Sequence, residues 1–253
     1  MELGQVALIA TGLFVAGFVK GTTGLGYSTC ALPFLVAAVG LKTAIVIVPI
    51  PAMAANIGLL FGAGHIRETI ERFWIFYAAS IPGIFYGTTL LGWVDQESAT
   101  RVLGVITVFY VIYGVIHPNF RLPAAAETPL QLPGGLLNGF LTGLTGSQII
   151  PLLPYMLSLK LEPDRFVQAV NLAVVTASLI LILALIYSGL MTWPLAMLSA
   201  LGVLPASLGV FLGNGMRTRI GSQTFRKVVL VTLLAMGFAF MINFNSFFSA
   251  LAG

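Results

Sequence analysis

Residues 17–35 read GFVKGTTGLGYSTCALPFL, a stretch in which a lysine and several glycines interrupt a long apolar run. The run extends from about residue 3 to residue 40, which exceeds the ~20 residues that one helix needs to cross a bilayer. Glycine and threonine are poor residues for a continuous helix and favour an unwound turn. We therefore expect residues 3–40 to be broken within residues 21–28, and their length favours a hairpin that enters the membrane and returns.

The composition of the whole chain indicates that most of its surface faces lipid. Of the 253 residues, 58% are hydrophobic and only 8% are charged, whereas about a quarter of the residues of a soluble domain are charged. Apolar stretches are found at residues 3–19, 29–40, 43–64, 73–93, 102–116, 134–158, 166–188, 194–215 and 228–248. The expected fold class is all-α, as a polytopic integral membrane protein. A β-barrel would instead show short segments of alternating polarity.

The two halves of the chain resemble each other. GFVKGTTG at residues 17–24 matches GFLTGLTG at 139–146, and SIPGIFYGTTLLG at 80–92 faces VLPASLGVFLGNG at 203–215. We predict two homologous repeats of about four hydrophobic segments each, each repeat opening with a segment broken at a glycine-rich turn. Whether the repeats are parallel or inverted depends on whether each broken segment crosses the membrane once or returns as a hairpin.

A proline-rich connector separates these repeats. The predicted division is an N-terminal transmembrane repeat at 1–116, an exposed linker at 117–133 and a C-terminal transmembrane repeat at 134–253. A duplicated unit is the common plan of secondary transporters, in which the substrate binds near the middle of the membrane between the repeats. Channels and structural membrane proteins are also built by duplication, so the plan alone does not decide between them.

The glycine-rich turns carry groups that suit an anion. Unwound backbone at membrane depth is tolerated only inside protein or beside a watery cavity. Its free N–H groups and the N-terminus of the following half-helix present partial positive charge. The residues expected to bind substrate are Lys20, Gly21, Thr22, Thr23, Gly24, Gly26, Tyr27 and Ser28, with Gly143, Thr145, Gly146, Ser147 and Gln148 from the second half. Alternatively, the glycines are small residues that let helices pack closely.

Asn56, Gln168 and Asn171 are secondary candidates for the same site. Each side chain can donate a hydrogen bond to a bound oxyanion, and each can equally satisfy a carbonyl group freed in a neighbouring helix. The choice between these roles stays open at the level of the sequence.

Lys20 is the one charged residue expected well inside an apolar segment. A charge near the bilayer centre costs ~3 kcal/mol or more, so such a residue usually points into a cavity and has a function. Lys20 either attracts an anion or extends its long side chain to the membrane interface. All eight Asp and Glu residues fall in loops or at the termini, so we do not expect proton coupling through a carboxylate within the membrane.

Other classes of function match poorly. His65 and His117 lack the paired spacing of a metal site, no phosphate-binding loop occurs, and no metal or cofactor is expected. Cys30 is the single cysteine, so no disulfide can form within the chain. The formal charge of +4 is spread over short loops, where Lys and Arg record membrane orientation, so no nucleic-acid partner is expected.

Residues 17–35 and the stretch GFLTGLTGSQIIPLLPYMLSLKLEPDRF at 139–166 resemble the sulfite exporter TauE/SafE family of membrane permeases. The resemblance implies transport of sulfite, of sulfonates such as sulfoacetate or of other small anions across the bacterial inner membrane. It also implies that the turns at 21–28 and 143–148 line the transport path. Many members carry Gly-x-Gly-Gly-Gly in the first turn, where this chain has Gly-Leu-Gly-Tyr-Ser at 24–28, which alters the size and polarity of the pocket.

We therefore predict a multi-pass secondary transporter and not an enzyme. A small anion would dock between the broken segments, held by backbone amides and by Thr23, Thr145, Ser147 and Gln148, with Lys20 attracting it. The two halves would then rock to alternate access. We expect the protein to be surrounded by membrane lipid. The helix faces that carry small residues are compatible with a homodimer. The alternatives are an anion channel with the same site, whose flux would not saturate, and a membrane scaffold or assembly protein without flux.

Overall fold

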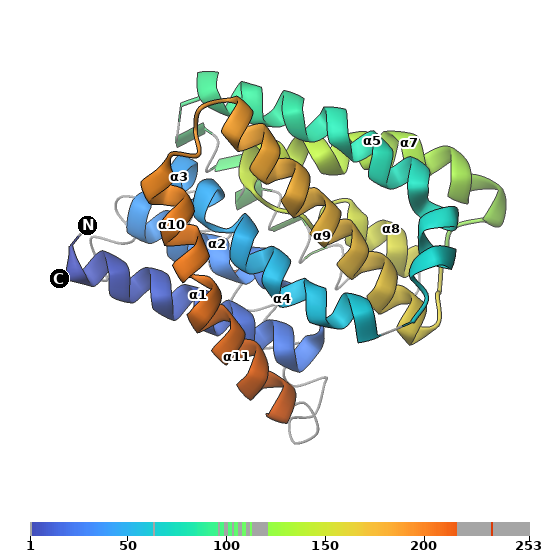
Figure 1. Ribbon diagram of the computed structural model, residues 1–253. Helices are drawn as coiled ribbons and strands as arrows, with labels where there is room; N and C mark the ends of the chain where they lie inside the picture. The colour runs from blue at the N-terminus through green and yellow to red at the C-terminus, as the bar shows by residue number, and fades with distance from the viewer. Residues whose placement is uncertain are drawn as a thin grey trace.

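The computed structural model describes residues 2–62, 64–95 and 121–216, together with a few residues between 97 and 112 and residue 234. All regular structure in these ranges is helical, which confirms the all-α class. In chain order the helices are α1 (Leu3–Thr23), α2 (Tyr27–Val39), α3 (Leu41–Ile47), α4 (Pro49–Gly62), α5 (Ile66–Trp93), α7 (Ala124–Thr145), α8 (Leu152–Ser158), α9 (Pro163–Tyr187), α10 (Trp193–Leu201) and α11 (Val203–Met216). Figure 1 shows them as a bundle of inclined helices.

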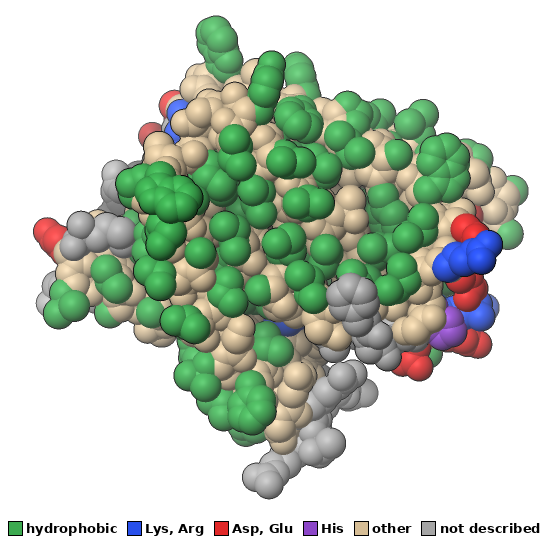
Figure 2. Space-filling view, in the orientation of Figure 1, with side chains coloured by type: hydrophobic (Ala, Val, Ile, Leu, Met, Phe, Trp, Pro, Cys, Tyr) green, Lys and Arg blue, Asp and Glu red, His purple; other side chains and the backbone are tan. Residues whose placement is uncertain are grey.

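Within the described residues, five helical stretches are long and apolar enough to cross a membrane. They are α1, the stretch Leu41–Gly58 that joins α3 to α4, α5, α9 and the stretch Trp193–Met216 that joins α10 to α11. Figure 2 shows hydrophobic side chains over most of one face, as lipid contact requires. Most of the predicted segment at 102–116, and all of the segment at 228–248 except residue 234, lie outside the described residues.

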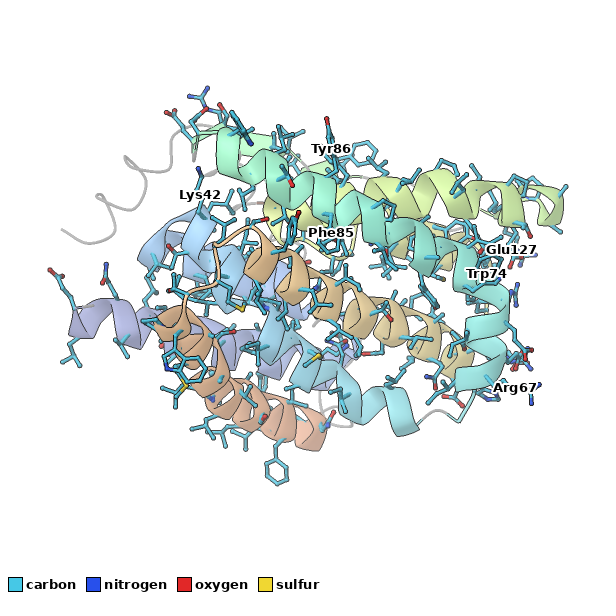
Figure 3. All side chains as sticks on the ribbon, turned by 45° about the horizontal axis from the view of Figure 1, so that its top comes forward. Lys42, Arg67, Trp74, Phe85, Tyr86 and Glu127 are labelled. Atoms are coloured by element: carbon cyan, nitrogen blue, oxygen red, sulfur yellow. The ribbon has the colours of Figure 1, made fainter. Side chains whose placement is uncertain are left out.

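Charged and aromatic side chains mark the two ends of the bundle. Figure 3 places Lys42 at one end and Arg67 and Glu127 at the other. Trp93 and Trp193 are 85% and 78% exposed at helix ends, the position that aromatic side chains take at a membrane interface. These features are those of a bundle that spans the bilayer from one end to the other.

Helix α7 begins inside the segment predicted to be a linker. Residues 117–120 are outside the described part of the chain, but α7 starts at Ala124 and includes Pro129 and Pro133. Both prolines lie beyond the first turn of α7, where a proline removes one backbone hydrogen bond and tends to kink the helix, so contacts with other helices must support α7 here. The bidentate pair of Arg72 with Glu127, at 2.6 and 3.0 Å, fixes the first turn of α7 to α5. Residues 124–133 of the stretch predicted as a linker are therefore helical.

Among the described helices, the most extensive contacts between the N-terminal and C-terminal parts of the chain are those of α5 with α7, α1 with α11, α4 with α9 and α5 with α9. Glycines allow two of these pairs to approach backbone to backbone. A Cβ atom on Gly17 would overlap the carbonyl oxygen of Ala206, and one on Gly139 would overlap that of Ser80. Small residues are the usual means of close helix packing in membranes. We call these packed helix pairs the frame of the bundle.

Candidate functional site

Helices α1 and α7 end in the same geometry. Gly24 follows α1 with φ 79° and ψ −2°, and its N–H group donates to the carbonyl of Lys20 at 2.7 Å. Gly146 follows α7 with φ 73° and ψ −4°, and its N–H group donates to the carbonyl of Thr142 at 2.8 Å. This left-handed conformation is one that glycine adopts readily. Each glycine therefore stops a helix inside the protein.

Threonine hydroxyls complete both helix ends. The N–H of Leu25 donates to Thr23 Oγ1, and the N–H of Ser147 donates to Thr145 Oγ1, both at 3.2 Å. The same hydroxyls donate to carbonyls of the preceding turn, at 2.8 Å for Thr23 and 2.7 Å for Thr145. The hydrogen bonds that the structure shows for the Thr23 and Thr145 hydroxyls are thus to the ends of their own helices.

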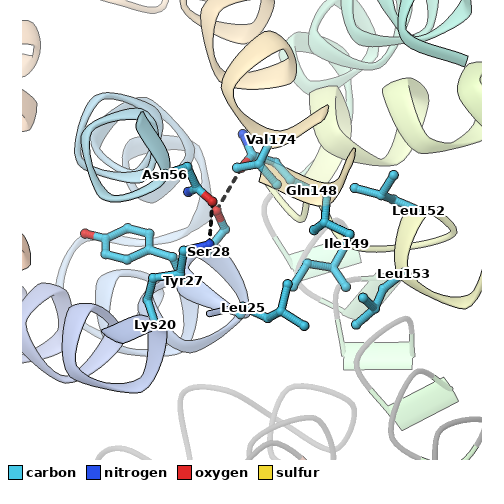
Figure 4. A pocket seen from close by; sticks show the side chains of 12 residues that line it. Lys20, Leu25, Tyr27, Ser28, Asn56, Gln148, Ile149, Leu152, Leu153 and Val174 are labelled. Atoms are coloured by element: carbon cyan, nitrogen blue, oxygen red, sulfur yellow. Dashed lines mark hydrogen bonds between the residues drawn. The ribbon is translucent and has the colours of Figure 1, made fainter. Parts of the chain in front are cut away.

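A cavity lies between these helix ends and helices α4 and α9. Its wall consists of Lys20, Leu25, Gly26, Tyr27, Ser28, Asn56, Gln148, Ile149, Leu152, Leu153, Val170 and Val174. The room inside it for the centre of a water-sized molecule is about 20 Å³, close to the space that one water molecule needs. Figure 4 shows polar side chains on one side and Leu25, Ile149, Leu152 and Leu153 on the other. The cavity therefore has a polar end and an apolar end.

Lys20 provides the single charge on this wall. Its side chain is only 2% exposed, so it does not extend to the membrane interface, and that alternative is wrong. Its Nζ donates three hydrogen bonds: to the carbonyl of Gly24 at 2.7 Å, to Asn56 Oδ1 at 2.6 Å and to Asn171 Oδ1 at 2.6 Å. All three acceptors are neutral oxygens.

The two asparagines are oriented by their own helices. Asn56 Nδ2 donates to the carbonyl of Ala52 at 2.5 Å in α4, and Asn171 Nδ2 donates to the carbonyl of Val167 at 2.6 Å in α9. Because only the amide nitrogen can donate to a carbonyl, Oδ1 of each side chain must face Lys20. The secondary candidates Asn56 and Asn171 therefore act first as a support for the ammonium group.

A second polar chain crosses the cavity. Ser28 Oγ donates to Gln148 Oε1 at 3.0 Å, and Gln148 Nε2 donates to Ser178 Oγ at 2.8 Å. The three side chains are almost fully buried. They connect α2, the segment that follows α7, and α9 beside the cavity.

Several predicted site residues lie away from the wall. Gly21 and Gly143 pack against α11 and α5, where an added Cβ atom would overlap the carbonyl oxygens of Val210 and Ile84. For these two glycines the packing alternative describes the structure. Thr22 Oγ1 donates to carbonyls within α1.

Gln168 and Ser147 are buried and are not part of the cavity wall. Gln168 is fully buried in α9, and neither its Nε2 nor its Oε1 has a hydrogen-bond partner among the described residues. Ser147 is buried, and its carbonyl accepts a hydrogen bond from Thr142 Oγ1.

The sequence analysis missed the apolar part of the wall. Ile149, Leu152 and Leu153 follow the second turn directly, and Val170 and Val174 lie one helical turn apart in α9. Their position next to the turns could have indicated that they line the cavity. They were not identified because most of the chain is apolar, so an apolar residue does not stand out in the sequence.

Acidic groups lie away from the cavity. No residue of the cavity wall is acidic, and the described Glu side chains that form ion pairs meet Arg or His at helix ends, as with Arg165 and Glu68 at 2.9 Å. Figure 2 shows such charges gathered at one edge of the molecule. Among the described residues, no group of three or more His, Cys, Asp or Glu could hold a metal ion.

Comparison with known proteins gives one match. A family model described as "Sulfite exporter TauE/SafE" matches residues 8–240. No curated protein and no solved structure matches the chain.

Proposed function

The chain belongs to the sulfite exporter TauE/SafE family, whose members are membrane permeases and not enzymes, and on this basis we propose that it carries a small anion through the cavity beside Lys20. The multi-pass arrangement in lipid follows from the family and from the five apolar helices. The bacterial inner membrane is the location that we infer for it.

The observation that carries the proposal is the burial of the Lys20 amino group beside the cavity, away from any acidic side chain of the cavity wall. The ammonium group is buried and is contacted by three neutral oxygens. A buried charge without a counter-ion is expensive because it has lost its hydration. An anion in the adjacent cavity would supply the missing counter-charge, whereas a cation would be repelled.

The start of α2 adds a second attraction. Its N-cap residue is Gly26, which has no side chain to cap the helix, and Gly26, Tyr27 and Ser28 all line the cavity. The first N–H groups of a helix have no intrahelical partner and carry partial positive charge. An oxyanion at this end of the 13-residue helix α2 would accept hydrogen bonds from these N–H groups. Lys20 has no free proton to donate to it, because all three are already bonded.

The apolar end of the cavity bears on the choice of anion. Ile149, Leu152 and Leu153 oppose the polar side chains, so a ligand with a charged head and a short organic tail would contact both ends. We infer that organosulfonates such as sulfoacetate are substrates together with sulfite.

Alternating access between two repeats is the mechanism that we propose. It is supported by the matching ends of α1 and α7 at Gly24 and Gly146 and by the crossed pairs α1–α11 and α5–α7. Bonds that link the two halves, Lys20 to Asn171 and Ser28 to Gln148, lie at the cavity. Rocking of one half against the other would open and close the site at these bonds.

The small-residue helix faces that suggested a homodimer are partly buried within one chain. The glycines that suggested intermolecular helix contacts are used within one chain, where Gly17, Gly139 and Gly209 meet backbone atoms of neighbouring helices. The transport proposal needs one chain only.

The test is flux of labelled sulfite and sulfoacetate into proteoliposomes. We expect saturable flux from the native chain and its loss in Lys20→Met, with Lys42→Met as the matched control because Lys42 lies at the end of the bundle. Absence of flux for both anions with folded native protein would overturn the proposal. Equal flux from the native chain and Lys20→Met would remove Lys20 from the site.

A further inference from the structure

We propose that Lys20 is a tethered cation seated in a built site for a monovalent cation, so that the protein carries its own counter-ion to the transported anion. The inference rests on the proposed function only where it says that the charge of Lys20 balances the transported anion. The existence of the cation site stands on the geometry around Nζ and can be tested without transport.

The first observation is the coordination of Nζ. Its three acceptors come from three places: the carbonyl of Gly24 beyond the end of α1, Asn56 in α4 and Asn171 in α9. The distances of 2.6 to 2.7 Å are short even for charge-assisted hydrogen bonds. Carbonyl and carboxamide oxygens are hard, neutral ligands, the type that holds alkali and ammonium ions where transporter helices are broken. We name these three oxygens the Lys20 cradle.

The second observation is that the cradle is preorganised. The amide nitrogens of Asn56 and Asn171 are bonded to carbonyls of their own helices, at Ala52 and Val167. Turning either amide over would place its oxygen against the carbonyl oxygen of Ala52 or Val167 and its nitrogen against the ammonium group, and would break two hydrogen bonds. The oxygens therefore converge on one point whether or not the lysine side chain occupies it.

The third observation is that Lys20 has no freedom to serve as a mobile arm. All three protons of its ammonium group are used, and the side chain is 2% exposed. No acidic residue lines the adjacent cavity. A fixed positive charge that faces the cavity does the work that a co-bound metal ion does in cation-coupled carriers, so no such ion is required at this place.

The cradle should accept a free cation when the tether is removed. In Lys20→Ala the ammonium group and most of the aliphatic chain are lost, while the three oxygens remain. Ammonium and methylammonium can donate to these oxygens as Lys20 does. Tetramethylammonium has the same charge but cannot donate a hydrogen bond, which makes it the matched control ion.

The decisive experiment is the thermal unfolding of Lys20→Ala, purified in detergent, at constant ionic strength with increasing ammonium or methylammonium chloride. We expect a saturable rise in its melting temperature, because a ligand that binds the folded state stabilises it. We expect no such rise when tetramethylammonium is added to Lys20→Ala. We also expect none when ammonium or methylammonium is added to the native chain or to the double variant Lys20→Ala, Asn171→Ala. A Lys20→Ala protein whose melting temperature responds equally to all three ions would overturn the proposal.

A measurement on the intact side chain covers the case in which Lys20→Ala does not fold. Replacing the other three lysines, Lys42, Lys160 and Lys227, by arginine leaves one lysine for selective ¹⁵N labelling. A seated ammonium group should give a slowly exchanging NH₃⁺ resonance that Asn171→Ala weakens. Fast exchange of the Lys20 protons, as in a solvated lysine, would overturn the proposal.

Transport assays separate this inference from the proposed function. Recovery of sulfite flux in Lys20→Ala with methylammonium, but not with tetramethylammonium, would support both. A cradle that binds ammonium in a protein that moves no anion would leave the inference standing and overturn the proposed function alone.

Discussion

Asn171→Asp tests whether the unbalanced charge of Lys20 holds the anion. The substitution keeps the size of the side chain and places a carboxylate where Asn171 Oδ1 now accepts a bond from Nζ at 2.6 Å. An anion centred ~5 Å from the ammonium group gains about 3 kcal/mol from it at an effective dielectric constant of ~20. A carboxylate beside Lys20 cancels most of that gain. We expect the dissociation constant for sulfite to rise by about two orders of magnitude.

The effect on stability should be much smaller than the effect on binding. The substitution removes the N–H group that bonds the carbonyl of Val167, at a cost of about 1–3 kcal/mol, and the new ion pair with Lys20 offsets part of this. Isothermal titration with sulfite measures the affinity, and a thermal melt reports the fold. Asn214→Asp is the matched control, since it adds the same charge at an exposed position of α11. A folded Asn171→Asp protein with unchanged sulfite affinity would refute the electrostatic argument.

Three further changes test the frame and the cavity. Gly139→Ala, whose new methyl group would overlap a carbonyl oxygen of α5, should lower stability by several kcal/mol in a thermal melt, whereas Gly58→Ala, with open space around it, should have little effect. Gly146→Ala should lower the melting temperature more than Gly189→Ala does. Both glycines have positive φ, but only at Gly146 do side chains lie within 4 Å of the added atom. Equal decreases would mean that backbone strain alone determines the loss of stability. Leu153→Asn should raise the KM for sulfoacetate more than that for sulfite; equal changes would mean that the apolar end does not contact the organic tail.

Hydropathy predicted the main helices, but not where all of them begin. The apolar stretches at 166–188 and 194–215 correspond closely to α9 and to α10 with α11. Helix α5 starts at Ile66, seven residues before its apolar stretch at 73–93, because its first turns carry charged side chains that pair with other helix ends. The start of α7 was missed because proline content was a stronger sequence signal than the ion pair that fixes this helix.

The polar part of the site was partly predictable. Lys20 was identified from the cost of a charge in an apolar segment, and Gln148 from its place after a repeated glycine. Their arrangement was not predictable, since Asn56 and Asn171 lie 36 and 151 residues from Lys20 and only the crossing of α1, α4 and α9 brings them together. The glycines were ambiguous because one residue type serves both turns and close packing: Gly24 forms a turn, while Gly21 packs.

The most direct test of the central claim is counterflow of sulfite in proteoliposomes. Vesicles that contain the native chain are loaded with concentrated unlabelled sulfite and diluted into a trace of labelled sulfite. A carrier with one alternating site predicts transient accumulation of label above its external concentration, and Lys20→Met should abolish this overshoot while Lys42→Met retains it. Equilibration without an overshoot, at a rate that rises without saturation, would contradict the carrier account and indicate a channel.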